Sequence, residues 1–325
     1  MIRRPPRSTQ GVSSAASDVY KRQTLGSLDL TVIVLTLNEE LNLPECLDSL
    51  ILLHCPVYVV DSGSTDGTIE IAKSWGATVV EHPFENYGAQ RNWSQENLPI
   101  NTTWILHIDA DERLTPELGK EIINALNTVK PDVDGFLLRR RTVFLGKWIK
   151  HGGHYPSYHA RLYRWGSGRC EDRLYDQHYI VSGRVEKLLG DMIDTTPELL
   201  DWTLRHAGWA KSEAQELLLD SRSSGRLRGR LFGSPIERRR WMRQVIYNKF
   251  PPLLRALLYF LVRYVLRLGF LDGKRGLVFH FLQGFWYRFQ VDAYLLEDRL
   301  KSSKRADTNS TSTGTTNSNE KDSVS

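Results

Sequence analysis

Short apolar runs alternate with helix-like segments through the first third of the chain, and this alternation constrains the fold more than any other feature. Runs rich in Val, Ile and Leu are typical of strands that are covered on both faces of a sheet. Four runs are predicted to be strands: TVIVLTL (31–37), PVYVVD (56–61), ATVVEH (77–82) and WILHID (104–109). Helices are predicted from Pro44 to about Leu52 and from about Thr65 to Trp75, where Gly76 ends the second. This order predicts an α/β fold with a mainly parallel sheet and flanking helices.

Polar side chains gather where three of these strands end. They are Asn38, Glu39 and Glu40 after the first strand, DSGSTDG (61–67) after the second, and Asp109, Asp111 and Glu112 after the fourth. Ligands of such sheets bind beyond the carboxyl ends of the strands. We therefore expect the three clusters to meet and to form a binding site.

The acidic residues after the fourth strand have two interpretations. Buried carboxylates are costly unless they are paired or bound to a cation, which favours a metal at Asp109 and Asp111. Alternatively, Thr115 followed by Pro116 is typical of a helix N-cap, and Glu112 is then ordinary loop charge. The segment 61–67 has a similar alternative as a turn that caps a helix.

Several function classes are disfavoured by what the sequence lacks. Neither GxGxxG nor GxxxxGK[ST] follows the first strand, which argues against a dinucleotide-binding domain and a P-loop. A nucleotidyltransferase could share the sheet, but its Gly-rich signature with a following Arg and Lys is missing near that strand. Three cysteines without CxxC spacing predict neither a disulfide framework nor a zinc site, and they fit a reducing cytosol.

Charge divides the chain into two halves of opposite sign. Residues 24–201 hold 16 Lys and Arg against 26 Asp and Glu, whereas residues 202–300 hold 18 against 8. This predicts an acidic, cation-using part and a basic part that faces nucleic acid or lipid headgroups. The segment that would favour nucleic-acid binding is RSSGRLRGRLFGSPIERRRW (222–241). Its arginines are not accompanied by a recognisable nucleic-acid-binding motif, and the acidic half would repel phosphate.

The predicted organisation has four parts. Residues 1–23 lack an apolar signal-peptide core and resemble translated sequencing adapter, so they are predicted to be an artefactual or disordered prefix. Residues 24–200 are predicted to form one α/β domain with two parts, 30–112 and 113–200. Residues 201–300 are a basic amphipathic helical region, and residues 301–325, rich in Ser, Thr and Asn, are predicted to be a disordered tail.

Four ordered motifs carry a family resemblance. They are TLNEE (36–40), VVDSGSTDGT (59–68), GAQRN (88–92) and IDADE (108–112). In order and spacing they resemble family 2 inverting glycosyltransferases with the GT-A fold, and more loosely the bacterial subgroup of WaaE-like lipopolysaccharide-core glucosyltransferases. The resemblance implies transfer of a sugar from a nucleotide-sugar, favouring a UDP-sugar, to a glycan or lipid-linked saccharide of the bacterial cell surface. It makes residues 24–200 the expected catalytic domain, with a nucleotide-sugar part (30–112) and an acceptor part (113–200).

The resemblance also implies roles for individual residues. Thr36 and either Glu39 or Glu40 would border the nucleoside, Asp61 would accept from the base N–H, and Arg91 would approach the base or the diphosphate. Asp109 would contact the ribose or the metal ion, and Asp111 would bind the Mg²⁺ or Mn²⁺ that bridges the diphosphate. Oxygen ligands suit both cations.

An inverting transfer needs a general base on the acceptor side. GRCEDRLYDQH (168–178) is the one later acidic cluster beside aromatic residues and Gly, and it stands where the family carries its base. Asp172 is the first choice, with Asp176 and Glu171 as alternatives; the pair Glu171–Asp172 could instead be a surface ion pair. The segment departs from the His-Glu form of the WaaE-like pattern, which leaves the base open.

One further stretch is a candidate for contact with the acceptor. Residues 135–165 mix aromatic side chains with Arg and Lys, which fits an acceptor wall, although the aromatics could equally fill core.

The run 250–271 is apolar, yet Arg255, Arg263 and Arg267 interrupt it, and an Arg at the membrane centre costs at least about 2.5 kcal/mol. The three lie on one side of a helical wheel. We expect peripheral attachment to the cytoplasmic face of the bacterial inner membrane, with arginine meeting anionic headgroups. The alternative is a helical hairpin on the catalytic domain with its arginines in solvent.

Overall fold

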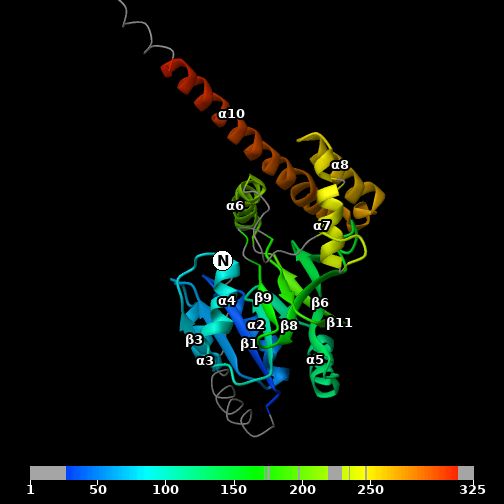
Figure 1. Ribbon diagram of the computed structural model, residues 1–325. Coiled ribbons are helices and arrows are strands. Elements are labelled where there is room, and N and C mark those ends of the chain that lie inside the picture. Colours follow the sequence, from blue (N-terminus) through cyan, green and yellow to red (C-terminus); the bar gives the residue numbers. More distant parts are fainter. Residues whose placement is uncertain are drawn as a thin grey trace, which may run out of the picture.

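The computed structural model describes residues 27–171, 173, 176–196, 198–218, 229–233, 235–245 and 247–313 of the 325-residue chain (Figure 1). The strands are β1 (Leu30–Thr36), β2 (Val57–Asp61), β3 (Thr78–Glu81), β4 (Trp104–Asp109), β5 (Glu112–Leu114), β6 (Val133–Phe144), β7 (Lys147–Trp148), β8 (Ser157–Arg164), β9 (Gly168–Cys170), β10 (Tyr179–Val181) and β11 (Arg184–Thr195). The α-helices are α2 (Leu43–Leu50), α3 (Thr68–Trp75), α4 (Tyr87–Asn97), α5 (Pro116–Thr128), α6 (Leu199–Leu218), α7 (Pro235–Val245), α8 (Leu254–Leu261), α9 (Gly273–Phe279) and α10 (Tyr287–Thr313). Short 3₁₀ or π segments are η1 (Ile51–Leu53), η2 (Tyr247–Lys249), η3 (Val262–Leu266), η4 (Gly269–Asp272) and η5 (His280–Trp286).

A mixed sheet forms the centre of the protein. Its strand order is β3-β2-β1-β4-β8-β6-β11-β5, with β7 paired to β6. The first four strands in this order are parallel, whereas β8 runs antiparallel to both of its neighbours. The predicted α/β fold is confirmed, and the parallel part is the nucleotide-sugar part of the sequence. The order of the strands along the chain reverses at β1, which is where open α/β sheets place their ligands.

Alternating residues of the strands supply two cores, one on each face of the sheet. Val32 and Val34 of β1 face a core that α2, α3 and α5 close, while Ile33 faces a second core with Trp93 of α4 and the β9–β10 ribbon. Figure 1 shows α2 and α3 beside the parallel strands and α5 beside β11. Burial on both faces explains the nearly unbroken apolar runs of the sequence.

The predicted elements agree with the observed ones to within a few residues. The largest difference is the start of α3, which was expected at about Thr65 and lies at Thr68. The backbone N–H of Thr65 donates to Asn38 Oδ1 at 2.8 Å, so this stretch is a loop that is tied to the first motif. Thr115 is the predicted N-cap of α5, because its hydroxyl accepts from the N–H of Leu118.

The C-terminal helices gather at one end of the sheet, and α10 extends away from the body of the protein (Figure 1). Phe144 and Ile149 pack with Trp202 of α6 and Phe279 of α9, so an apolar cluster joins the helices to β6 and its following loop. A second small cluster joins α6 to α10. None of the helices in the described ranges combines the length and the apolar character needed to cross a bilayer.

Two predictions about the C-terminal region need correction. Arg255 and Arg263 do not form a solvent-facing basic side, because each is buried with an internal acceptor: Asp292 for the first and the carbonyl of Gly152 for the second. Only Arg267 of the three is exposed.

The predicted disorder from residue 301 is also not observed as far as Thr313, because α10 continues through these residues. Lys301 pairs with Glu297 one turn earlier, which supports the helix there. The predicted prefix 1–23 lies outside the described residues, as does the tail from 314 onward.

Candidate active site

The carboxyl ends of three parallel strands meet, as the sequence predicts. In the register of the sheet Thr36 lies opposite Asp61, and Leu35 lies opposite Asp109. A cleft of about 1390 Å³ opens at this edge and continues under the C-terminal helices. Its volume exceeds the usual upper limit of about 1000 Å³ for one drug-sized ligand, so it has room for a donor and an acceptor together.

The first two motifs hold each other through side-chain to backbone hydrogen bonds. Glu39 N–H donates to the hydroxyl of Thr68, and Glu40 N–H donates to Asp66 Oδ2. In return, Glu40 Oε2 accepts from the N–H of Gly67 at 2.9 Å. These bonds fix the loops that line the nucleotide end of the cleft. Burial raises the pKa of Glu39, and the nearby carboxylate of Asp109 adds to this shift.

Asp61 is fully buried and organises its own turn. Its carboxylate accepts four hydrogen bonds, from the hydroxyls of Thr36 and Ser64 and from the backbone N–H groups of Gly63 and Ser64. It does not line the cleft, whereas its neighbour Ser62 does. A base N–H could bind Asp61 only by replacing one of these donors. The geometry therefore favours a supporting role for Asp61 over the direct contact that the resemblance implies.

Asp109 lies between two buried arginines. Arg91 Nη2 is 2.9 Å from both carboxylate oxygens of Asp109, and Arg161 Nη2 is 2.7 Å from Oδ2 and 2.8 Å from Glu112 Oε1. Burial alone would raise the pKa of Asp109, but attraction to Arg161 and Arg91 holds it well below the ordinary value. Arg91 is therefore paired with Asp109 and is not available to bind a base or a diphosphate. Glu112 is not loop charge, because it lies buried in β5 against Arg161.

Asp111 has the opposite environment two residues later. Burial raises its pKa well above the ordinary value, and the carboxylates of Asp194, Asp109 and Glu112 raise it further. The nearest cation recorded for it is Arg205 of α6, whose Nη1 is 3.9 Å from Asp111 Oδ2. Asp111 lines the cleft. It is thus the carboxylate of this cluster that lacks close neutralisation.

A divalent cation fits this arrangement. Within the described ranges, no three His, Cys, Asp or Glu side chains are placed to hold a metal ion by themselves. Mg²⁺ and Mn²⁺ do not need such a set, because they are commonly held by one or two carboxylates together with water and substrate phosphate oxygens. The excess negative charge around Asp111 is what such a cation would neutralise.

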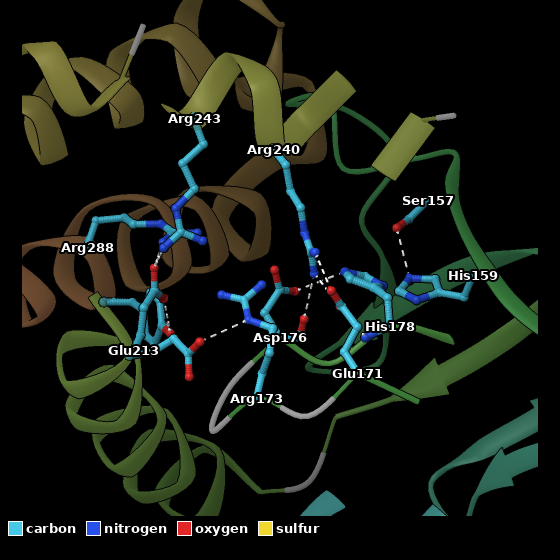
Figure 2. Close-up of polar contacts among 12 residues, drawn as sticks. Ser157, His159, Glu171, Arg173, Asp176, His178, Glu213, Arg240, Arg243 and Arg288 are labelled. Atoms are coloured by element: carbon cyan, nitrogen blue, oxygen red, sulfur yellow. Dashed lines mark hydrogen bonds and ion pairs between the residues drawn. The ribbon is translucent and has the colours of Figure 1, made fainter. Parts of the chain in front are cut away.

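The segment predicted to carry the base contributes Asp176 and His178 to the cleft lining, and Figure 2 shows both beside Glu171. Asp172, the first choice, lies outside the described residues. Asp176 lines the cleft, has a left-handed backbone (φ 57°), and is 3.2 Å from His178 Nε2. Burial alone would raise its pKa, but the hydrogen bond and charge of His178, together with Arg243, lower it. Asp176 is therefore an ionised carboxylate that faces the acceptor side.

Glu171 is held in an ion pair, which disfavours it as the base. Its two carboxylate oxygens accept from Arg240 of α7 at 2.6 Å each, and one of them also accepts from the N–H of His178 at 3.0 Å. The side chain is buried, and Figure 2 shows Arg240 reaching down from α7 onto it. Arg240 also donates to the carbonyl of Asp176 at 3.1 Å. This ion pair ties Glu171 to α7, so Glu171 could accept a proton from an acceptor only by giving up contacts with Arg240.

The stretch 135–165 divides between the two expected uses. Phe136, Phe144 and Tyr163 are buried in the cores, whereas polar residues of the same strands line the cleft, among them Arg140, His154 and His159. The polar members of this stretch, and not its core aromatics, are thus available to contact a ligand in the cleft. Helices α6 and α9 add Trp202 and Phe279, which lie beyond the predicted catalytic domain.

Two arginines of this site were missed by sequence reasoning. Arg161 lies in β8, inside the alternating pattern SYHARLYR (157–164), where nothing distinguishes it from a surface arginine. Arg205 lies in α6 among other charged residues of the basic half. Only their positions in space reveal that both approach the acidic cluster.

Comparison with protein families identifies the domain that carries this site. The model of glycosyl transferase family 2 matches residues 31–182, which include the four motifs and the cleft loops described above. Residues 31–182, just under half of the chain, are a glycosyltransferase family 2 domain. The resemblance predicted from the motifs is confirmed. The family 2 domain ends before α6, so Trp202 and Arg205 are additions to it.

Curated relatives share parts of the family 2 domain. A lipopolysaccharide core biosynthesis glycosyltransferase, LpsC of Rhizobium meliloti (strain 1021), is 31% identical over 150 residues, covering 44% of this chain and 54% of that protein. An uncharacterized glycosyltransferase of Rickettsia typhi (strain ATCC VR-144 / Wilmington) is 39% identical over 93 residues, covering 29% of this chain and 31% of that protein. The chain thus spans between about a third and half of the length of these relatives.

Two solved bacterial structures align with parts of the chain. TarS of S. aureus aligns over 82% of this chain and 55% of its own at 17% identity, with a TM-score of 0.38. Glucosyl-3-phosphoglycerate synthase from Mycobacterium tuberculosis, in complex with Mn²⁺, UDP and glucosyl-3-phosphoglycerate, aligns over 44% of this chain and 50% of its own at 22% identity, with a TM-score of 0.29.

Proposed function

We propose that the protein is a metal-dependent inverting glycosyltransferase that moves a sugar from a nucleotide-sugar, with a UDP-sugar as the favoured donor. The observation that carries the proposal is the contrast between two carboxylates at one strand end of a family 2 domain. Asp109 is neutralised by two buried arginines, whereas Asp111 faces the cleft and, among the residues that the structure describes, has one cation within 4 Å, Arg205 at 3.9 Å. A site for a divalent cation and a diphosphate needs such an uncompensated carboxylate.

Asp111 would hold Mg²⁺ or Mn²⁺ at the diphosphate of the donor. When bound, the cation supplies positive charge that stabilises the departing nucleoside diphosphate. Arg205 lies beside Asp111 and projects from α6 into the same cleft, where it supplies a second positive charge from the protein. The loops of Glu39, Glu40 and Asp66 would border the nucleoside, because they line the other end of the cleft.

Asp176 is our proposed general base. The acceptor hydroxyl oxygen attacks the anomeric carbon, its proton passes to the carboxylate, and the bond from that carbon to the diphosphate oxygen breaks. Attack from the face opposite the leaving group inverts the configuration at the anomeric carbon. Asp176 is ionised and opens onto the acceptor side of the cleft, as this step requires. Asp172 stays an alternative, whereas the ion pair with Arg240 disfavours Glu171.

We further propose that the acceptor is a saccharide, free or lipid-linked, of the bacterial cell surface, and that the protein works at the cytoplasmic face of the membrane. Support comes from LpsC, a relative named for lipopolysaccharide core biosynthesis, and from the basic C-terminal half. The wall of polar and aromatic residues around Arg140, His159 and Trp202 is suited to sugar hydroxyls and ring faces.

A donor panel tests the proposal. Thermal melting with UDP-, GDP- and dTDP-sugars, each with and without Mn²⁺, should show a rise for one nucleotide that depends on the metal, because a ligand that binds the folded state stabilises it by mass action. Asp111→Asn should abolish that metal-dependent rise, and Asp298→Asn, a matched change on exposed α10, should preserve it. Equal shifts with and without Mn²⁺ for every donor would overturn metal-dependent binding.

A further inference from the structure

The helical hairpin formed by α8–η3 and α9–η5, joined at η4, is polar toward the protein and apolar toward the outside. Arg255 pairs with Asp292 through its Nε at 2.9 Å, and Arg263 Nε donates to the carbonyl of Gly152 at 2.8 Å; both side chains are buried. The opposite side of α8 and η3 exposes leucine and valine at helical spacing, including Leu257 and Leu261, which are 42% and 41% exposed. A helix in contact with water normally has the reverse orientation.

The exposed apolar residues belong to both arms of the hairpin. Here α8 packs against η5, and the ring of Phe260 lies 5.4 Å from Tyr264 and 6.2 Å from Phe281, so aromatic contacts connect the two arms. We call this surface the apolar face. It consists of Leu254, Leu257, Leu261, Val262, Val265, Leu266, Leu268, Phe270, Leu271, Leu277, Val278 and Phe281. Large exposed apolar patches of this kind mark sites of protein or membrane contact.

The charge around the apolar face has one sign. Between Lys249 and Val291 the sequence contains a single acidic residue, Asp272, which is buried and accepts from the N–H of His151 at 2.9 Å. The exposed charged residues there are the cations Lys249, Arg267, Lys274 and Arg275. A second copy of the chain would bring the same cations to a symmetric contact, where they would repel. Anionic lipid headgroups complement them.

We propose that the apolar face lies in the headgroup region of an anionic membrane, parallel to its plane. Apolar side chains would enter the boundary with the acyl chains, and the surrounding cations would meet headgroups. This corrects the sequence-based expectation, since Arg255 and Arg263 attach the hairpin to the rest of the protein. The cations that would face the lipid are Arg267 together with Lys249, Lys274 and Arg275.

The hairpin also places the cleft next to the membrane. Phe279 and Gln283 line the cleft, whereas Val278 and Phe281, from the same helical segment, are exposed on the apolar face. Cleft and membrane would thus be separated by about one helix diameter, roughly 10 Å. Given the proposed function, on which this step depends, an acceptor saccharide attached to a membrane lipid could enter the cleft without leaving the bilayer surface.

Flotation of the full chain with vesicles tests the proposal. We expect the protein to float with phosphatidylcholine vesicles that contain about 30% phosphatidylglycerol at low salt, and to float much less with phosphatidylcholine alone. Leu257→Gln with Leu261→Gln should lower the membrane partition coefficient at least about tenfold. The control replaces Leu189 and Leu200, which are 64% and 68% exposed on β11 and α6 outside the apolar face, by Gln and should float like the intact protein.

Thermal melting of each variant verifies that it is folded, and Phe281→Gln on the second arm gives an independent reading if the double variant does not fold. Failure of the intact protein to float, or equal flotation of test and control variants, would overturn the proposal. A dimer in solution that the Leu257/Leu261 variant dissociates would assign the face to a second copy instead. Asp111→Asn should float normally, so loss of sugar transfer and loss of membrane binding are separable.

Discussion

Replacing Asp109 or Asp111 by Asn makes the same chemical change at positions two residues apart, yet the structure predicts opposite effects on stability. Asp109 accepts three hydrogen bonds from the buried side chains of Arg91 and Arg161. In Asp109→Asn these arginines lose the negative charge that compensates for their burial. In Asp111→Asn a neutral amide replaces a carboxylate whose charged form is disfavoured by burial and by the neighbouring acids.

The magnitude for Asp109 follows from its contacts. A hydrogen bond to a charged group contributes about 1.5–3 kcal/mol, and breaking a buried ion pair costs about 3–5 kcal/mol. Asn retains one acceptor oxygen and Arg161 keeps Glu112, so we expect a loss of about 3 kcal/mol, near the lower limit. For a domain of this size that corresponds to a melting temperature lower by roughly 6 °C. Asp111→Asn should leave the melting temperature unchanged or raise it.

The assay is thermal or urea unfolding at pH 7 in EDTA, so that no divalent cation contributes, followed by sugar-transfer assays with Mn²⁺. Asp111→Asn should lose at least about a hundredfold in kcat while remaining fully folded, as expected for a group that holds charge on the leaving diphosphate. Asp298→Asn on α10 serves as the control for both readings. If Asp111→Asn destabilised the protein as much as Asp109→Asn, the division of roles between the two carboxylates would be wrong.

Three further predictions follow from the site and from the hairpin. Asp176→Asn should abolish sugar transfer while donor binding, measured by thermal shift, stays within about twofold, because only deprotonation of the acceptor is lost; a parallel loss of donor binding would contradict this role. Excess EDTA should stop turnover and added Mn²⁺ or Mg²⁺ should restore it, whereas full activity in EDTA would exclude a metal at Asp111. Burial, assisted by the charge of Arg263, lowers the pKa of His280 to about 4. The unfolded chain, with a His pKa near 6.5, then binds one more proton between these values, so stability should fall as the pH drops from about 6.5 toward 4. His280→Gln should flatten this slope in melting curves, and an unchanged slope would show that other groups cause it.

The sequence predicted the parallel part of the fold because its local signals and its burial agree. The apolar runs of β1, β2 and β4 are covered on both faces, and Thr115 and Gly76 mark helix ends with side-chain and backbone chemistry that acts locally. Prediction was weaker for the rest of the sheet. In β6 and β11 buried and half-buried positions mix, because one end of each strand lines the cleft and carries charged residues.

The site was predicted where motifs are contiguous and missed where partners are distant in sequence. Asp109 and Asp111 are two residues apart and share a motif, but their different environments come from Arg161, 52 residues after the first, and from Arg205 in α6. Likewise, the sequence made Glu171 a candidate base. In the structure Arg240, 69 residues later, donates to both of its carboxylate oxygens. Charge pairing at such separations leaves no local pattern.

The C-terminal helices complete the acceptor side of the cleft as well as the proposed membrane contact. Arg240 of α7 fixes the loop of Asp176, and Glu213 of α6 binds both Arg243 of α7 and Arg288 of α10 (Figure 2). These ion pairs connect the loop of the proposed base to helices outside the family 2 domain. The loops of Glu39, Glu40 and Asp66, by contrast, lie within that domain. Under the proposed function, donor recognition would depend on the family 2 domain, whereas the C-terminal helices would help to set which acceptor is presented, and from which surface.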